Sequence, residues 1–334
     1  MERGNTQCLA NTAFAFALTG VKPTNFFGAM EKKVKVFAEG ANPQEICNAL
    51  WSIAMLGLAR EKEFMLKTIW DRACKTDPKL FNNASMGQLY QVTVHARVDG
   101  LMLQPVSSVL RGNMAAAMKA LVDVPSKSQV EYSSLLRQIG FRHISEVPAL
   151  PPEEDAAGFL SIDMADMERK IAIEYDGAPH FLTDLKEDSK QNHGRENGQS
   201  TAKRRLLEKM GWKVLNIPFH VNVDMNKISG PGRKAAKVAY LRDLLTSSGV
   251  DVPWHSVKGV DHDIGSTDAD AHLYGDLGVG DSVGGGGGGQ EQFYAPSDPY
   301  AEQEQQVSKH FVERGGGEGD KKQHETRAIM MRNS

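Results

Sequence analysis

Two carboxylates stand two residues apart in IAIEYDGAPHF, residues 171–181, at the end of an apolar run. Apolar and polar residues alternate there, which predicts a strand with Glu174 and Asp176 on one face and Ile173 on the other. Two acids that project side by side before a turn at Gly177 could hold a hard cation. The same pattern also fits an ordinary strand with one solvated face, so the neighbouring residues must decide.

A third acid and a lysine extend this set. Asp163 lies on the polar face of the strand predicted for residues 161–167, and pairing of neighbouring strands would bring it beside Glu174. In the helix predicted for STAKRRLLEKM, residues 200–210, Lys203 falls within the apolar arc. A buried ammonium needs a partner, and the acids are the obvious candidates. The alternative is that the stem of Lys203 extends to the surface.

An Asp, a Glu and a nearby Lys are the parts of a hydrolytic metal site. Asp163 and Glu174 would be ligands of a hard cation such as Mg²⁺, and Lys203 would steady a water or a developing negative charge. We therefore take Asp163, Glu174, Asp176 and Lys203 as the candidate catalytic residues, with Asp163 and Glu174 as the candidate metal ligands.

The elements that position these residues follow a helical region, residues 1–125, with an internal repeat. QCLANTAFAFALTG aligns with QEICNALWSIAMLG at a spacing of 37 residues, and a looser third copy begins near MGQLYQVTVHARV. The aligned pairs are Gln7 and Gln44, Leu9 and Ile46, Asn11 and Asn48, Phe14 and Trp51, Ala17 and Ala54, and Gly20 and Gly57. Such a period is typical of stacked helix pairs, so we expect two or three pairs with Phe14, Trp51, Phe64 and Trp70 in the core.

Residues 128–250 change to the period of strands. A helix, SQVEYSSLLRQIG, is followed by three strand candidates, FRHISEVPAL, GFLSIDMADM and KIAIEYDG. After a polar loop over residues 182–198 and the helix of Lys203 come a fourth strand, WKVLNIPF, and a closing helix, RKAAKVAYLRDLLTSSG. The order αβββαβα predicts an α+β unit with a mixed sheet flanked by helices.

The last region, residues 255–334, contains six consecutive glycines, Gly284 to Gly289, and few aliphatic side chains. This composition predicts a disordered tail. From Asp261 onward 14 acids face 6 Lys or Arg, a balance of −8, so the overall charge of −3 leaves +5 on the preceding residues. A mildly basic body is compatible with a polyanionic partner.

No apolar run approaches the ~20 residues needed to span a bilayer, so we expect no membrane partner. The three cysteines form no CxxC motif, which is typical of thiols in a reducing compartment. The first residues, MERGNTQCLANTAFAFAL, enter a helical pattern without a basic leader. We therefore expect either a chain that works where it is made or a sequence that has lost its true N-terminus.

Several motifs occur in an order that resembles a RAP domain. KIAIEYDGAPHF is followed by a loop, by TAKRRLLEKMGWKVLNIPF and by a terminal YLRDLL, so that the similarity covers roughly residues 130–248. Acid-x-Asp-Gly, His-Phe, Lys-Arg-Arg-x-Leu and Gly-Trp in this order are specific to that module. RAP domains close the FAST-kinase-like and octotricopeptide-repeat proteins of mitochondria and chloroplasts. The helical first half is similar to the repeats that precede the module there, although it lacks the proline-rich octotricopeptide signature.

This resemblance implies RNA binding in a mitochondrion or chloroplast, for transcript stability, processing, translation or ribosomal RNA maturation. It implies organellar mRNA or rRNA as the partner, other RNA-processing proteins as a further partner class, and no cofactor for binding. RAP domains are also similar to the PD-(D/E)xK endonuclease fold. When the PD-(D/E)xK pattern is applied to this sequence, Asp163 corresponds to its first acid and Glu174 to its second. Asp176, however, stands where that pattern has a lysine. Lys203 is the candidate replacement from the helix.

For RNA binding, the phosphates would be contacted by cations of the helix, the next strand and the polar loop, and bases would stack on ring side chains. The predicted RNA-binding residues are His180, Phe181, Lys186, Lys190, Arg195, Arg204, Arg205, Lys209 and Lys213. Trp212 opens a strand, which favours the core for it. Two alternatives stay open: a Mg-dependent ribonuclease that uses the candidate catalytic residues, and a scaffold whose repeats recruit a protein partner.

Overall fold

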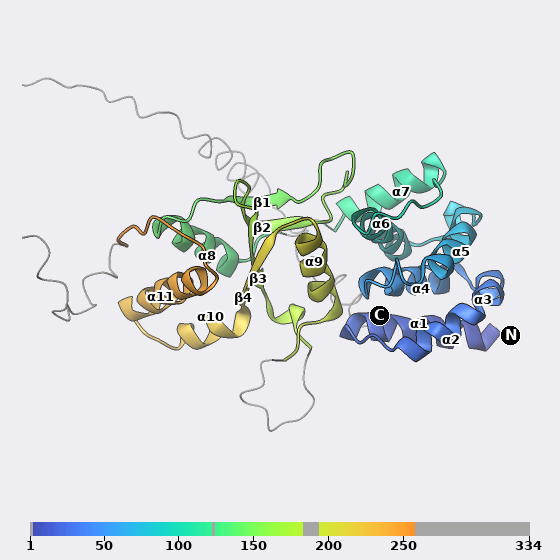
Figure 1. Ribbon diagram of the computed structural model, residues 1–334, viewed down its shortest axis with the longest axis horizontal. Coiled ribbons are helices and arrows are strands. Elements are labelled where there is room, and N and C mark those ends of the chain that lie inside the picture. Colours follow the sequence, from blue (N-terminus) through green and yellow to red (C-terminus); the bar gives the residue numbers. More distant parts are fainter. Residues whose placement is uncertain (1–2, 122–123, 183–193, 258–334) are drawn as a thin grey trace, which may run out of the picture. The chain divides into compact units, whose positions relative to one another are not determined.

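The computed structural model describes residues 3–121, 124–182 and 194–257 (Figure 1). Its N-terminal part consists of helices in three successive groups. In these groups α1 (Arg3–Thr19) is followed by α2 (Thr24–Lys32) and α3 (Val34–Gly40), α4 (Pro43–Met55) by α5 (Glu63–Cys74), and α6 (Asn83–Val98) by α7 (Ser108–Lys119). The predicted helical repeats, including the third copy, are confirmed.

The first helices of the three groups lie side by side, with α4 between α1 and α6. The repeat brings equivalent side chains together. Asn48 Nδ2 approaches Asn11 Oδ1 at 3.5 Å, and Gln88 Nε2 donates to Asn48 Oδ1 at 3.1 Å. Trp51 packs against Phe14 with ring centres 5.0 Å apart. The internal repeat of the sequence therefore corresponds to a physical stack of helices.

The second half contains a four-stranded sheet. After α8 (Lys127–Gln138) come β1 (Ile144–Pro148), β2 (Ser161–Asp166) and β3 (Ile171–Asp176), then α9 (Gly198–Lys209) and β4 (Lys213–Pro218). The strand order is β1-β2-β3-β4, with the first three antiparallel and β4 parallel to β3, because α9 crosses between them. The predicted mixed sheet and the order αβββαβ are confirmed.

Two helices follow the sheet. α10 (Phe219–Asn226) leads directly from β4 and was not predicted, since FHVNVDMN shows no apolar stripe of its own. α11 (Pro231–Ser247) is the predicted closing helix. It packs with α8 on one face of the sheet, in a core that includes Ile173 of β3 (Figure 1).

The other face of the sheet is covered by α9 (Figure 1). Leu206 of α9 and Ala172 of β3 belong to one apolar core that continues into the helical repeats as far as Trp51. α9 therefore lies between the sheet and the helices α1, α4 and α6. Glu174 and Asp176 share the face of Ala172, as the alternation along the strand predicts, so they point toward α9.

All the described residues fall within one compact unit. The boundary predicted near residue 125 falls inside this unit, and the division into domains 1–125 and 128–250 stays a prediction. The tail predicted for residues 255–334 lies outside the described residues, apart from 255–257.

Most of the aromatic residues assigned to the helical core are there. Trp51 and Trp70 are buried, and Phe14 is half-buried against Trp51. Phe64 was assigned wrongly, because it is 58% exposed in the first turn of α5. Trp212 is buried as predicted. Among the described helices, none combines the length and the apolar character needed to cross a bilayer.

Candidate functional site

The predicted acids and lysine meet between the sheet and α9. Glu174 projects from β3, and Asp163 reaches the same space from the neighbouring strand β2. Lys203 enters from α9, with Nζ 2.5 Å from Glu174 Oε2 and 3.9 Å from Asp163 Oδ1. The Lys203 side chain is 30% exposed, so it pairs with the acids while one side stays open to solvent.

One buried carboxylate oxygen of this cluster is left without a hydrogen bond within the described part of the chain. Asp163 Oδ2 accepts a hydrogen bond from the backbone N–H of Tyr175 at 2.8 Å, and Glu174 Oε2 accepts one from Lys203. Glu174 Oε1 is buried and has no such partner. A buried, unsatisfied carboxylate oxygen is unfavourable, which favours the neutral form of Glu174.

Asp176 occupies the outer end of the same face. Asn216, on the adjacent strand β4, donates through Nδ2 to Asp176 Oδ2. His180 Nδ1 lies 3.3 Å from Asp176 Oδ1 and 2.9 Å from Ser200 Oγ on α9. Asp176 is therefore held by an amide and an imidazole, while Lys203 serves the other two acids.

Burial and the neighbouring charges shift the pKa values of the residues in this cluster. Burial raises the pKa of Glu174 to about 8, against the attraction of Lys203, and the charge of Asp163 acts in the same direction as burial. Burial also raises the pKa of Asp163. Burial by itself lowers the pKa of Lys203, but the carboxylates of Glu174 and Asp163 outweigh it, so that pKa is raised. The cluster therefore keeps its lysine charged and favours a protonated carboxyl near neutral pH.

This arrangement does not fit a metal ion. The ammonium of Lys203 already contacts Glu174 and approaches Asp163, the two predicted ligands. A divalent cation between them would have to displace that charge, and Asp163 Oδ2 is already bound by a backbone N–H. In residues 3–121, 124–182 and 194–257 no group of three or more His, Cys, Asp or Glu side chains is arranged to hold a metal. The metal and catalytic roles stay predictions that the geometry does not support.

Two of the predicted RNA-binding arginines contact the helical repeats. Arg195 Nη2 donates to the carbonyl of Thr19 at the end of α1, at 2.5 Å. Arg205 donates to the carbonyls of Ala54 and Met55 at the end of α4, at 2.9 and 2.7 Å. The last carbonyls of a helix lack partners within it, and a cation there also offsets the negative end of the helix dipole. These arginines thus close the ends of two repeat helices.

Lys209 makes the corresponding contact with α6. It forms an ion pair with Asp99, which follows α6 directly and whose side chain is 1% exposed. Arg205 Nη2 also lies 3.2 Å from Nδ1 of the buried His95. Burial, together with the charge of Arg205, lowers the pKa of His95 to about 3, so His95 is neutral and accepts at Nδ1. To bind phosphates, Arg205 and Lys209 would have to leave these partners.

Two other predicted phosphate contacts lie nearer to solvent. Arg204 pairs with Glu196 and keeps a third of its side chain exposed. Lys213 is exposed at the start of β4, where its Nζ donates to the carbonyl of Ser248. Both cations can therefore face a ligand without breaking the contact between α9 and the repeats.

The predicted ring residues differ in exposure. The His180 side chain is 45% exposed beside Asp176. Phe181 is half-buried, with its ring centre 5.4 Å from that of Phe219. Lys186 and Lys190 lie outside the described residues.

Sequence reasoning missed three residues of these surfaces. Asn216 holds Asp176, and its signal was a polar residue at an inward position of the apolar run WKVLNIPF. Ser200 holds His180, and its signal in the sequence was only a polar residue at the start of the predicted helix. Trp254 stands beside the start of the predicted tail and gave no local signal, although it is an exposed residue of the fold.

The family model of the RAP domain matches residues 173–244. This range begins in β3, includes α9 and β4 and ends in α11. RAP domains are generally RNA-binding domains, so the match supports RNA binding by this chain. The resemblance to a RAP domain is thereby confirmed for the segment that carries Glu174, Asp176 and Lys203.

Proposed function

We propose that this protein binds single-stranded RNA through its RAP domain, without a bound metal, and acts on mRNA or rRNA of a mitochondrion or chloroplast. The match of residues 173–244 to the RAP family carries the proposal. The positive balance of the chain before its acidic end supports it, because RNA phosphates attract such a surface. In this proposal the RNA-facing cations are Arg204 and Lys213, and the group of Asp163, Glu174 and Lys203 fixes α9 on the sheet.

Binding is tested with the full chain and a short fluorescein-labelled single-stranded RNA, by anisotropy at low salt and in EDTA. We expect binding in EDTA, and a loss of about fivefold or more when Arg204 and Lys213 are both changed to Ala. Lys227→Ala is the matched control, since Lys227 pairs with Asp224 on an exposed helix of the same domain. If the wild-type chain shows no RNA affinity at low salt, the proposal fails and a protein-recruiting scaffold becomes the better explanation.

A metal-dependent ribonuclease is the second candidate, because Asp163, Glu174 and Lys203 do meet in space as such a site requires. It predicts cleavage of labelled RNA in Mg²⁺ or Mn²⁺ that Glu174→Gln abolishes. The proposal made here predicts no cleavage by the wild-type chain and unchanged RNA affinity for Glu174→Gln, provided that the variant folds.

The organellar role rests on the family resemblance. In that role the protein would act in RNA stability, RNA processing, translation or rRNA maturation. Other RNA-processing proteins would be further partners. Fractionation of cells that express the tagged full-length protein tests the location. Recovery of the protein and its cross-linked RNA from the cytosol alone would overturn this part of the proposal.

A further inference from the structure

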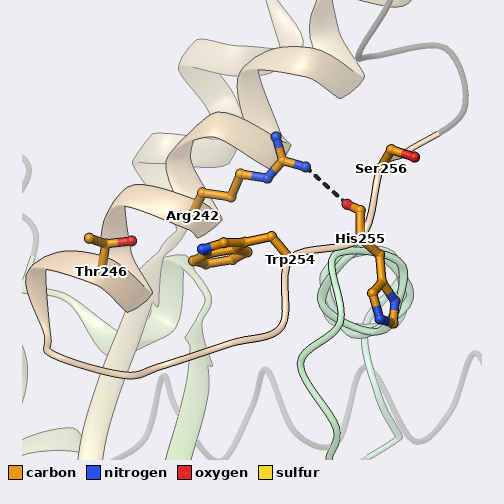
Figure 2. Close-up of a pocket in the computed structure, with 5 residues that line it drawn as sticks. All are labelled: Arg242, Thr246, Trp254, His255 and Ser256. Carbon is orange, nitrogen blue, oxygen red and sulfur yellow. Dashed lines mark hydrogen bonds between the residues drawn. The ribbon is translucent and has the colours of Figure 1, made fainter. Parts of the chain in front are cut away.

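The four tryptophans of the chain differ sharply in exposure. Trp51, Trp70 and Trp212 are at most 6% exposed, whereas Trp254 is 42% exposed. Trp254 lies beyond the RAP match, which ends at residue 244. It lines an open pocket of about 350 Å³ together with Arg242, Thr246, His255 and Ser256 (Figure 2). Since burial of an aromatic ring is strongly favourable, an indole left half in solvent needs an explanation.

The segment that carries Trp254 is firmly anchored. Val252 and Val257, on either side of Trp254, are buried in the core beneath α11. The backbone N–H of His255 donates to the carbonyl of Ile139 at 3.1 Å. Gly140 permits this close approach, because a Cβ there would lie 2.3 Å from the carbonyl oxygen of the neighbouring proline of the segment. The indole is therefore held outward by a fixed backbone.

Cations surround this segment. Three of them bind its carbonyl oxygens: Lys213 binds that of Ser248, Arg169 that of Asp251, and Arg242 that of His255 at 3.0 Å. Arg169 is also paired with Asp166, and Arg242 is the cation whose guanidinium lies over the indole of Trp254. A partly exposed ring with Arg242 beside it is suited to an anionic ligand that carries its own flat ring.

Arg242 also orients the indole. Its guanidinium carbon lies 6.0 Å from the ring centre of Trp254, within the range of a cation–π contact. Figure 2 shows the Arg242 side chain crossing above the indole, Thr246 beside it and His255 turned away. All the other residues that line the pocket are charged or polar, which favours a nucleobase over an apolar protein side chain as the occupant.

We propose that Trp254 is a base-stacking residue, on which an unpaired base of single-stranded RNA lies while Arg242 and Lys213 contact the adjacent phosphates. This inference rests on the proposed RNA-binding function and adds a site outside the matched family range. Aromatic stacking needs no particular base, because every base offers a π-face. The site therefore contributes affinity and position, while leaving sequence preference to other contacts.

Tryptophan fluorescence tests the inference in the full chain, because the other three tryptophans are shielded. We expect single-stranded RNA to quench the emission and to protect it from iodide, and Trp254→Phe to remove most of that change. Trp254→Ala should weaken RNA binding by about 5- to 150-fold, as for the loss of one stacked base. Trp254→Phe keeps an aromatic face and should bind within a few-fold of wild type.

Phe64→Ala is the matched control, since Phe64 is also an exposed aromatic residue but lies in the helical repeats. It should leave RNA affinity unchanged. The inference is overturned if wild-type protein binds RNA by anisotropy while its iodide accessibility stays constant, or if Trp254→Ala binds as tightly as wild type. Absence of RNA binding by the wild-type chain would instead refute the proposed function itself. The iodide measurement needs no variant, so it decides the matter even if Trp254→Ala misfolds.

Discussion

Lys203 is the positive charge that allows two carboxyl groups, Glu174 and Asp163, to share one face of the sheet. It contacts Glu174 directly and approaches Asp163, while Asp176 depends on Asn216. Removing one partner of a buried ion pair is more harmful than never having the pair, because the remaining charge stays desolvated. Lys203 therefore has a structural role whether or not the cluster binds any ligand.

Lys203→Met should lower the free energy of unfolding by roughly 1–3 kcal/mol, because Asp163 loses its counter-charge and Glu174 Oε2 loses its hydrogen-bond donor. Urea denaturation followed by circular dichroism measures it. Lys227→Met is the better control than Arg204→Met, because Arg204 pairs with Glu196 whereas Lys227 forms only an exposed pair. Lys227→Met should change the free energy of unfolding by less than about 0.5 kcal/mol. Equal, small effects of both changes would mean that the acids are solvated.

The raised pKa of Glu174 makes stability depend on pH. The folded state holds the proton up to a pKa of about 8, whereas the unfolded chain releases it near the usual pKa of about 4.3. This stabilisation is complete below the unfolded pKa and is lost as the pH rises through the folded one. The pKa values of the buried His95 and His143 are lowered to about 3 and about 4. These histidines therefore change the stability only below their usual pKa of about 6.5.

The free energy of unfolding should therefore fall by on the order of 1 kcal/mol between about pH 6.5 and 8.5. Denaturant titrations at several pH values measure this slope. Glu174→Gln removes the titrating group and should flatten the curve. A stability that rises over this interval in the wild-type chain would contradict a protonated Glu174.

At the scale of elements, α9 connects the sheet to the helical repeats. Lys203 and Arg205 are two residues apart, about 200° around the helix, so they meet opposite partners. Lys203 faces the acids of the sheet, while Arg205 closes the end of α4 and Lys209 pairs with Asp99 after α6. Lys203, Arg205 and Lys209 of α9 thus connect the sheet to the repeats, whereas Arg204 pairs with Glu196.

Gly198 should be indispensable for this docking. A Cβ at Gly198 would lie 1.7 Å from the carbonyl oxygen of Ala17 in α1, which no side-chain adjustment can relieve. Gly198→Ala should lower the free energy of unfolding by about 1–3 kcal/mol, or more, as overpacking does. Gly112→Ala is the control, because Gly112 lies in α7 with open space around it. That change should be neutral or stabilise by up to about 1 kcal/mol.

Variants of Arg205 distinguish whether this side chain docks α9 on the helical repeats or binds RNA. Arg205→Met removes the side-chain donors to the carbonyls of Ala54 and Met55, of which Ala54 keeps the backbone N–H of Gly57, and should lower the free energy of unfolding by about 2 kcal/mol. Arg205→Lys should recover only part of the lost free energy of unfolding, since one ammonium group cannot reproduce the two-pronged guanidinium contact. Thermal and chemical unfolding measure both variants. A fully stable Arg205→Met protein with weakened RNA binding would show that Arg205 serves RNA instead.

At the scale of the whole molecule, the RAP domain and the repeats share a core. Leu206 of α9 packs in the same apolar cluster as Trp51 of α4. Cutting the chain near residue 125 would expose both surfaces, so point variants in the full chain test RNA binding more cleanly than fragments. Because this core is shared, a substitution that destabilises the RAP domain should also destabilise the helical repeats.

RNA affinity should depend strongly on salt, because phosphate contacts release counterions. If about four phosphates are contacted, the logarithm of the association constant should fall with the logarithm of salt concentration with a slope near −3. Anisotropy titrations at several salt concentrations measure it. Lys213→Ala should make the slope less negative by about 0.7, the share of one phosphate. A slope near zero would contradict an interface of this kind.

The sequence alone determined the elements other than α10, the faces of the strand that carries Glu174 and Asp176, and the approach of Lys203. These follow from local periodicity, since alternation along a strand and 100° steps along a helix fix which side chains share a side. It also determined the helical repeat and the RAP motifs, because both are patterns of order along the chain.

Only the tertiary structure decided what lies opposite each face. Arg205 and Lys209 lie on α9, but the ends of α4 and α6 that receive them are more than a hundred residues away in the chain. Asn216 reaches Asp176 only because β4 returns parallel to β3. The outward position of Trp254 depends on packing beneath α11. Partners distant in the chain leave no local period, so folding alone decides whether a cation docks a helix or faces RNA.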